Sequence, residues 1–388
     1  MHELYIMDIK YPELKLIDSF IKADEGSGIQ NSISKNGDKI FITYFTTAFI
    51  QSIAGELFIN NCGKLENSKL VLGDSSFSKL NGGKANNKFD KFTVLDSSNG
   101  IARIKLLDSN LNVIRTKTFN DYFFNGNSFN GGVFSDDGIY IGITYIYDGN
   151  IGQNFQKSVL RILRSDNLLE VATYKYDGYT DINGFRFLNN NYIIINSVFG
   201  VYSDINKNSS PPSYLSVLKI NSNNIKLIDQ TELPEICKFD IYKNIIFVGT
   251  DRVSHNLSNY VEDNQSFINF DNDEYRVYKF KNNKLKLLAK KSFDNAVMPN
   301  IYSDGQFITI QQASQYNGEG YFEISKLQYQ SCNKCQDDYI PKKYESSLSK
   351  PSLPKYILNF SENGKWAIIT GATTIINKYN NIQLYQIY

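Results

Sequence analysis

The sequence predicts an all-β chain that folds as a single β-propeller, most simply with seven four-stranded blades. A unit of strand, tight polar turn and strand recurs along the chain at a spacing of roughly 50 residues, which is the period range of propeller blades. Aromatic residues make up 14% of the chain, with 27 Tyr and 26 Phe against 8 Pro. Tyr and Phe favour pleated, half-buried strands, so the composition agrees with the repeat.

One half of the repeating unit is a hairpin. Its copies read NSISKNGDKIFITYF from Asn31, GGVFSDDGIYIGITY from Gly131, NIYSDGQFITIQ from Asn300 and LNFSENGKWAIITG from Leu358, with weaker copies from Gly184 and Lys238. The Asn-Gly and Asp-Gly pairs predict two-residue turns, because these residues adopt positive φ at low cost. The flanking alternation of apolar and polar residues places one face of each hairpin inward.

The other half of the unit is a second pair of strands around a short polar turn, for example SVLRILRSDNLLEVATYKY from Ser158. Joined in order, the two halves make meanders of four strands, A to D. We place the blades of a single domain (1–388) at residues 29–72, 76–119, 131–175, 183–231, 237–293, 298–345 and 355–388, the last completed by residues 4–20. The second of these units fits the repeat least well.

The two ends of the chain are predicted to pair. The segment ELKLIDSF from Glu13 resembles a D strand, and it can complete the last blade and so remove the open edges of the sheet. One strand is then surplus, because LYIMDI from Leu4 and the terminal IQLYQIY both resemble C strands.

The S-x-[DN]-G-[KQI] turn between strands A and B, together with the C strand that follows, resembles WD40-like propellers of the lactonase-like (YVTN) class. This resemblance implies a seven-bladed fold and often a binding role, and it carries over no catalytic residue. The G-H…W-D signature of true WD40 repeats is not matched, since the chain has 2 His and 1 Trp.

Charge and hydropathy limit the kinds of partner that we expect for this chain. With 41 basic and 40 acidic residues the net charge is +1, so no overall field would recruit nucleic acid. No apolar run is long enough to cross a membrane, and the first residues have neither a basic stretch nor an apolar core typical of a signal peptide. We therefore expect a soluble chain without membrane insertion, located inside the cell or within a larger particle or complex.

The long B–C connections are the predicted binding face, since function often resides on long loops of a rigid scaffold. The longest runs from Asp251 to Glu274. Its candidate binding residues are His255, Glu262, Asp263, Asp271, Asp273 and Glu274. Clustered carboxylates of this kind hold Ca²⁺ when six or more oxygens converge, and otherwise form a solvated acidic loop.

Cys332 and Cys335 form a C-x-x-C pair in a polar segment. Two thiolates at this spacing supply half of a zinc site shared with another chain, a small disulfide, or a redox pair. Cys62 and Cys237 lie in predicted strands, where we expect them to be small core residues.

No catalytic constellation stands out, and the nucleophile motif G-x-S-x-G is absent from the sequence. We therefore expect a non-enzymatic scaffold that binds another protein or joins a larger assembly through its long loops, with no resident cofactor. The alternatives are a lactonase-like or glycoside-active hydrolase with carboxylates in the central channel, and a carbohydrate-binding propeller.

Overall fold

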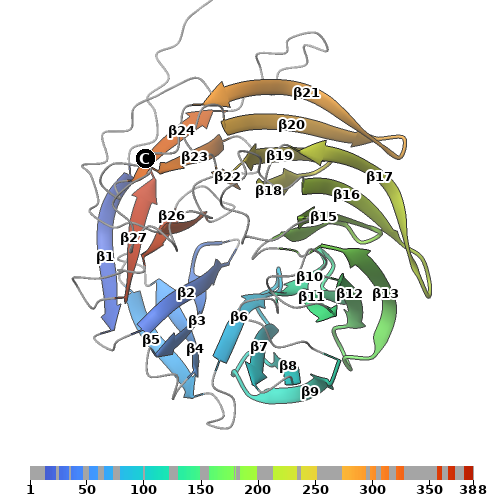
Figure 1. Cartoon of the computed structure of the whole chain (residues 1–388). Helices are drawn as coiled ribbons and strands as arrows, with labels where there is room; N and C mark the ends of the chain where they lie inside the picture. The colour runs from blue at the N-terminus through green and yellow to red at the C-terminus, as the bar shows by residue number, and fades with distance from the viewer. Residues whose placement is uncertain are drawn as a thin grey trace, which may run out of the picture.

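The computed structural model describes residues 14–22, 26–34, 36–46, 52–59, 65–72, 79–98, 101–121, 130–148, 157–178, 180, 184–198, 213–233, 237–250, 273–293, 298–302, 307–313, 320–326, 356–360, 366–371 and 380–387. Within these ranges the regular structure consists of strands alone. The strands form seven antiparallel sheets arranged as a β-propeller (Figure 1). The predicted all-β propeller is confirmed.

We number the blades along the chain. Blade 1 contains β2 (Gly26–Ile33), β3 (Lys39–Thr46), β4 (Ser52–Ile59) and β5 (Leu65–Leu72); blade 2 contains β6 (Lys79–Ala85), β7 (Phe92–Ser98), β8 (Ile101–Leu107) and β9 (Val113–Phe119). Blade 3 contains β10 (Asn130–Phe134), β11 (Tyr140–Asp148), β12 (Lys157–Arg164) and β13 (Glu170–Asp177); blade 4 contains β14 (Phe185–Asn189), β15 (Tyr192–Val198), β16 (Ser213–Ile220) and β17 (Ile225–Leu233). Blade 5 contains β18 (Cys237–Tyr242), β19 (Ile245–Thr250), β20 (Asp273–Lys281) and β21 (Lys284–Phe293); the described strands of blade 6 are β22 (Met298–Tyr302), β23 (Phe307–Ala313) and β24 (Gly320–Lys326). Blade 7 contains β25 (Tyr356–Phe360), β26 (Trp366–Gly371), β27 (Asn380–Ile387) and β1 (Leu14–Lys22).

The blades close into a ring. The first strands of successive blades contact one another in the order β2, β6, β10, β14, β18, β22, β25 and back to β2. These A strands lie toward the centre of the ring, and the D strands lie toward its rim (Figure 1). β1 pairs antiparallel with β27, so strands from both ends of the chain complete blade 7. The segment IQLYQIY is therefore a C strand, and LYIMDI lies outside the described residues.

A β-bulge recurs in the D strand of blades 1 to 5. In each of these sheets the C–D register shifts by one residue. The two bulge residues are Asn67 and Ser68, Val113 and Ile114, Glu170 and Val171, Leu227 and Ile228, and Leu287 and Leu288. A bulge increases the local twist of a strand. Because the bulge lies at the same point of each C–D pair, it identifies equivalent residues in blades 1 to 5.

The A–B turns of blades 1 to 3 differ from the two-residue turns that the sequence predicts, whereas in blade 5 two residues separate the paired Tyr242 and Ile245. In blade 3, Ser135 N donates to Tyr140 O at 2.9 Å, and Tyr140 N donates to Ser135 Oγ at 2.9 Å, so four residues lie between the closing pair. Only Gly138 of these turn residues has positive φ, at 73°. In blade 2, Asn86 replaces the serine and Phe89 replaces the glycine with φ at 57°. This replacement explains why the second unit fitted the repeat poorly.

The hydrophobic core lies between neighbouring blades. Leu95 and Ile104 of blade 2 pack in one cluster with Ile141 and Tyr145 of blade 3, and all four are almost fully buried. Two further clusters of the same kind join blade 3 to blade 4 and blade 4 to blade 5. Burying one large apolar side chain contributes about 1.5–3 kcal/mol, so each of these clusters stabilises the junction between two blades.

Candidate functional site

One register position places a single A-strand residue of each of blades 1 to 5 at the same level of the ring. In blade 2, Lys84 of strand A pairs with Thr93 of strand B, and Thr93 pairs with Leu106 of strand C. Leu106 is the last C-strand residue before the register shifts at the D-strand bulge. The same path through strands A, B and C can be followed in blades 1, 3, 4 and 5. We call these equivalent residues of blades 1 to 5 the inner layer: Ser32, Lys84, Val133, Arg186 and Asp240.

All five side chains of the inner layer are partly exposed, although they lie on the innermost strands. The A strands of a propeller surround its central channel. Of the five residues, Val133 packs against the apolar cluster between blades 3 and 4, and the other four are polar or charged. Three of the five positions carry a charge. The sequence reasoning missed these residues; the available signal was a charged residue inside an otherwise apolar A strand, as in FRFLN of β14.

Lys84 and Arg186 interact electrostatically although they come from blades that are not neighbours. Burial and, to a lesser extent, the positive charge of Arg186 together lower the pKa of Lys84 to about 8. Burial also lowers the pKa of Arg186, which the carboxylate of Asp240 opposes. In the described part of the chain the Lys84 ammonium has no carboxylate partner.

The A strand of blade 3 lies between the strands of these two cations, and two glycines precede its inner-layer residue Val133. Thr93 Oγ1 donates to Gly132 O at 2.7 Å and accepts from Lys84 N at 3.2 Å, so Gly132 lies beside the Lys84 backbone. On the other side, a Cβ at Gly131 would lie 2.7 Å from the Phe185 ring, next to Arg186. Gly131 and Gly132 have φ of 115° and 67°, a region where glycine is unstrained.

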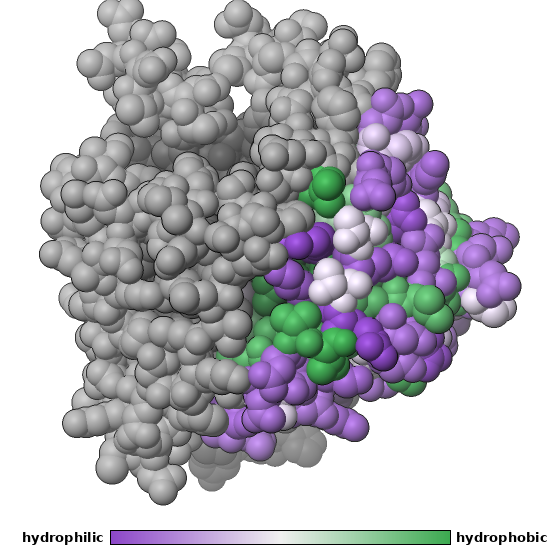
Figure 2. Space-filling view, turned by 90° about the horizontal axis from the view of Figure 1, so that it is seen from below, coloured by the Kyte–Doolittle hydropathy of each residue, from purple (hydrophilic) through white to green (hydrophobic). Residues whose placement is uncertain are grey.

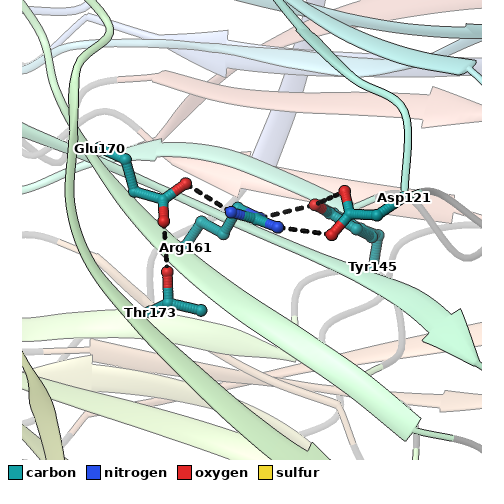
Figure 3. A network of polar contacts seen from close by, with 5 residues as sticks. All are labelled: Asp121, Tyr145, Arg161, Glu170 and Thr173. Carbon is teal, nitrogen blue, oxygen red and sulfur yellow. Dashed lines mark hydrogen bonds and ion pairs between the residues drawn. The ribbon is translucent and has the colours of Figure 1, made fainter.

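A second polar group joins blade 2 to blade 3, and we call it the inter-blade clamp (Figure 3). Arg161 Nε donates to Tyr145 Oη at 2.6 Å, and Tyr145 Oη donates to Asp121 Oδ1 at 2.7 Å. Arg161 also forms ion pairs with Asp121 and Glu170, each at 2.5 Å. Burial and the hydrogen bond to Asp121 raise the pKa of Tyr145 well above its ordinary value, so the phenol stays protonated. The protonated phenol and its charged partners connect blade 2 with blade 3.

Ion pairs recur at the register position of Arg161 in two other blades. Lys105 of blade 2 lies 2.9 Å from Asp96, and Arg276 of blade 5 pairs with Glu274. Glu274 also lies 2.5 Å from Lys290. Burial alone would raise the pKa of Glu274, but hydrogen bonds from Lys290 and Arg276 hold it below its ordinary value.

Of the residues predicted from the Asp251–Glu274 loop, the structure describes Asp273 and Glu274. Asp273 is the first residue of β20 and Glu274 is the second, so both belong to a strand. His255, Glu262, Asp263 and Asp271 lie outside the described residues, as do Cys332 and Cys335. Among the residues that are described, no group of three or more His, Cys, Asp or Glu could hold a metal ion. Calcium at the loop and zinc or a disulfide at the cysteines stay predictions.

Exposed apolar side chains gather at one end of the ring. Six of the seven large apolar side chains that are exposed in the described part lie in, or within four residues of, an A–B or C–D turn. We call them the turn-end rim: Val113, Ile114, Ile139, Leu169, Leu227 and Leu287. The seventh, Ile101, lies at the opposite end, where the B–C loop enters β8. Figure 2 shows hydrophobic residues, in green, reaching the surface among hydrophilic ones.

Comparison with solved structures places this architecture among β-propellers. The Dos1 propeller matches with a TM-score of 0.51 and 10% identity, over 96% of this chain and 95% of that one. Hydrazine synthase from Kuenenia stuttgartiensis matches with a TM-score of 0.52 and 10% identity, over 97% and 99%. The propeller domain of the trilobed protease from Pyrococcus furiosus, described as having an open velcro topology, matches with a TM-score of 0.50 and 8% identity, over 98% and 95%.

The chain is thus a β-propeller protein, and likeness at such low identity shows the fold alone. No protein-family model matches the sequence, and neither does any curated protein. Of the residues that the structure describes, none belongs to a helix that could span a membrane.

Proposed function

We propose that this protein is a non-enzymatic β-propeller that binds another protein, acting as an interaction or scaffold module. Its assignment to the WD40-like, lactonase-like (YVTN-type) propellers is part of this proposal. The observation that carries it is the turn-end rim. Single exposed apolar residues are common on protein surfaces, but exposed apolar side chains gathered on one face are typical of interaction surfaces.

The D-strand bulge gives the rim a repeating geometry. Val113, Leu227 and Leu287 are each the first residue of the bulge in their own blade. Their exposed fractions are 50%, 39% and 45%, so three blades present an apolar side chain at the same level. Glu170 is the equivalent residue of blade 3, and the neighbouring Leu169 is 63% exposed. A rigid, repeated apolar rim suits the apolar centre of a protein interface.

The long B–C loops at the other end of the ring remain a second predicted surface of the same module. The hydrolase alternative needs carboxylates that converge on the channel. The inner layer of blades 1 to 5 instead has two cations and one carboxylate, Asp240. No described feature favours this alternative.

The rim can be tested by purifying the tagged protein from its native source. The double variant Ile139→Glu/Leu169→Glu places charges on the rim, and Ile101→Glu places the same charge on an equally exposed residue at the opposite end. Partner stoichiometry is measured by light scattering and mass spectrometry of the purified complex. We expect the double variant to lose a stoichiometric partner that Ile101→Glu retains.

A third variant separates the two faces, with residues 254–270 replaced by a short Gly-Ser linker. If this variant alone loses the partner, binding belongs to the loop face and the rim argument is wrong. If the wild-type protein purifies without a stoichiometric partner, the interaction-module proposal itself is wrong. Circular dichroism and a cooperative thermal transition confirm that each variant is folded.

A further inference from the structure

We propose that the inner layer is a binding site for a small oxyanion, a carboxylate or a phosphate, held between Lys84 and Arg186. This site lies on the innermost strands and is separate from the turn-end rim, so it goes beyond the binding of another protein.

The first argument is geometric. Lys84 and Arg186 occupy the same register position two blades apart in the ring. β10 lies between their strands and contributes Val133 at that position, preceded by Gly131 and Gly132. The contact of Gly132 with Thr93 and that of Gly131 with Phe185 fix Lys84 and Arg186 on either side of this slim strand. The two cations therefore lie at the same level of the ring, on either side of β10.

The second argument is the balance of charge. An enclosed ammonium or guanidinium is costly unless an opposite charge accompanies it. The inner layer of blades 1 to 5 has two positive side chains and one negative one, and Asp240 comes from the blade next to Arg186, on the side away from Lys84. The lowered pKa of Lys84 has the direction expected for an ammonium that lacks a counter-charge. A bound anion would supply that charge.

The third argument concerns which anion fits. The planar guanidinium of an arginine matches the two oxygens of a carboxylate or phosphate, while a lysine contributes a point charge from another direction. Asp240 would repel an anion from the far side of Arg186, which favours binding on the side toward Lys84.

Protection of Lys84 from amine labelling is the direct test. The full-length protein is labelled at pH 8 with an amine-reactive reagent and digested, and labelling is quantified for each lysine by mass spectrometry. Inorganic phosphate and acetate are the probes, and sodium chloride at equal ionic strength is the control. We expect Lys84 labelling to fall saturably with phosphate, while the exposed Lys226 is unaffected.

Variants decide whether the two cations act together. We expect Arg186→Met to weaken the protection of Lys84 by phosphate at least tenfold, and Arg186→Lys to restore part of it. Lys226→Met should leave it unchanged. Protection by phosphate alone identifies a phosphate site, and protection by acetate as well identifies a general oxyanion site.

The proposal is overturned if chloride protects Lys84 as well as phosphate does at equal ionic strength. It is also overturned if Arg186→Met leaves the half-maximal phosphate concentration unchanged. Should Arg186→Met fail to fold, the comparison uses Arg186→Gln, which keeps the polar side chain and removes the charge.

Discussion

Lys84 shows how a single residue can oppose the stability of the fold that contains it. Its ammonium lies on the innermost strand beside another cation, and the structure describes no carboxylate next to it. A charged group that is poorly solvated and unpaired destabilises the folded state, because the unfolded chain solvates it fully. Residues retained at such a cost are often functional.

Replacing this ammonium with an apolar side chain should stabilise the protein. The pKa of Lys84 is about 8 in the folded protein and has its ordinary value of 10.5 in the unfolded chain. The destabilisation is therefore fully present below pH 8 and disappears as pH rises toward 10.5. We expect Lys84→Met to raise the free energy of unfolding by about 1–2 kcal/mol at pH 7, after allowing for solvent screening.

Urea denaturation at pH 7 and pH 10.5 in phosphate-free buffer measures this effect. Lys226→Met is the matched control and should change stability at neither pH. A Lys84→Met gain that persists unchanged at pH 10.5 would contradict the assignment to an unpaired ammonium. The relevant charged neighbours of Lys84 are Arg186 and, beyond it, Asp240.

Gly132 offers a second test at the residue scale. It combines φ of 67° with a close approach, since a Cβ would lie 2.6 Å from Thr93 Oγ1. Gly138 has a similar φ of 73°, but its nearest atom would be 3.6 Å away. We expect Gly132→Ala to cost about 2–4 kcal/mol and Gly138→Ala about 1 kcal/mol, because only the first adds a clash to the backbone strain. If chemical denaturation shows equal losses of unfolding free energy for the two variants, β10 moves to relieve the clash and the prediction is wrong.

At the scale of elements, the clamp around Arg161 joins the end of blade 2 to the face of blade 3. Its side chain is only 17% exposed, and it holds Asp121, Tyr145 and Glu170 at once. Its interactions exceed those of an ordinary surface ion pair, because removing the cation leaves two carboxylates and a phenol without their common partner.

We expect Arg161→Met to lower the free energy of unfolding by about 2–4 kcal/mol. Arg164→Met is the control on the same strand, since Arg164 pairs with Asp166 in solvent and its loss should not be measurable. Both are compared by urea denaturation at pH 7. A loss for Arg164→Met as large as for Arg161→Met would contradict the clamp.

The same clamp predicts a dependence on acid. Burial alone would raise the pKa of Glu170, but hydrogen bonds from Thr173 and Arg161 hold it below its ordinary value. The unfolded chain therefore takes up this proton first, and the contribution of Glu170 is lost as pH falls through and below the ordinary range of a glutamate. The stability difference between wild type and Arg161→Met should shrink from pH 7 to pH 3.

For the whole molecule, closure of the ring depends on β1. Deleting residues 1–22 removes the strand that covers the edge of β27, and an open edge can pair with another chain. We expect this deletion to lower the melting temperature by roughly 10 °C or more and to cause association. Deleting residues 1–13 keeps β1 and should preserve a monodisperse protein.

Light scattering and thermal unfolding distinguish these two deletions. A synthetic peptide of residues 14–22 added to the shorter chain should restore part of the stability. If deletion of residues 1–22 has no effect on either measurement, blade 7 does not need β1 to close.

The sequence predicted the elements well wherever local chemistry sets them. The repeated Ser…Gly turn marked the A–B hairpin of blade 3, because a glycine at positive φ is a local requirement. Blade 2 was harder to recognise, since Phe89 takes the same conformation and its burial in the core offsets the cost. The D-strand bulge left no sequence signature, because Ser68, Ile114, Val171, Ile228 and Leu288 share no common side chain.

The candidate site was not predictable in the same way. The sequence reasoning chose the acidic loop from Asp251 to Glu274, of which the structure describes Asp273 and Glu274 alone, so the loop site stays a prediction. Glu274 lies in a strand, where it pairs with Arg276 and Lys290. It did not connect Lys84 with Arg186, since about one hundred residues separate them and neither belongs to a recognisable motif.

By itself, the sequence determined the all-β class, the repeating four-strand unit and the pairing of the chain ends, because turns and alternation act over a few neighbouring residues. Only the tertiary structure decided which side chains share a level of the ring. That depends on register through three strands and a bulge, and a shift of one residue would turn every side chain to the other face. The inner layer and the turn-end rim therefore exist only once the blades have closed around a common axis.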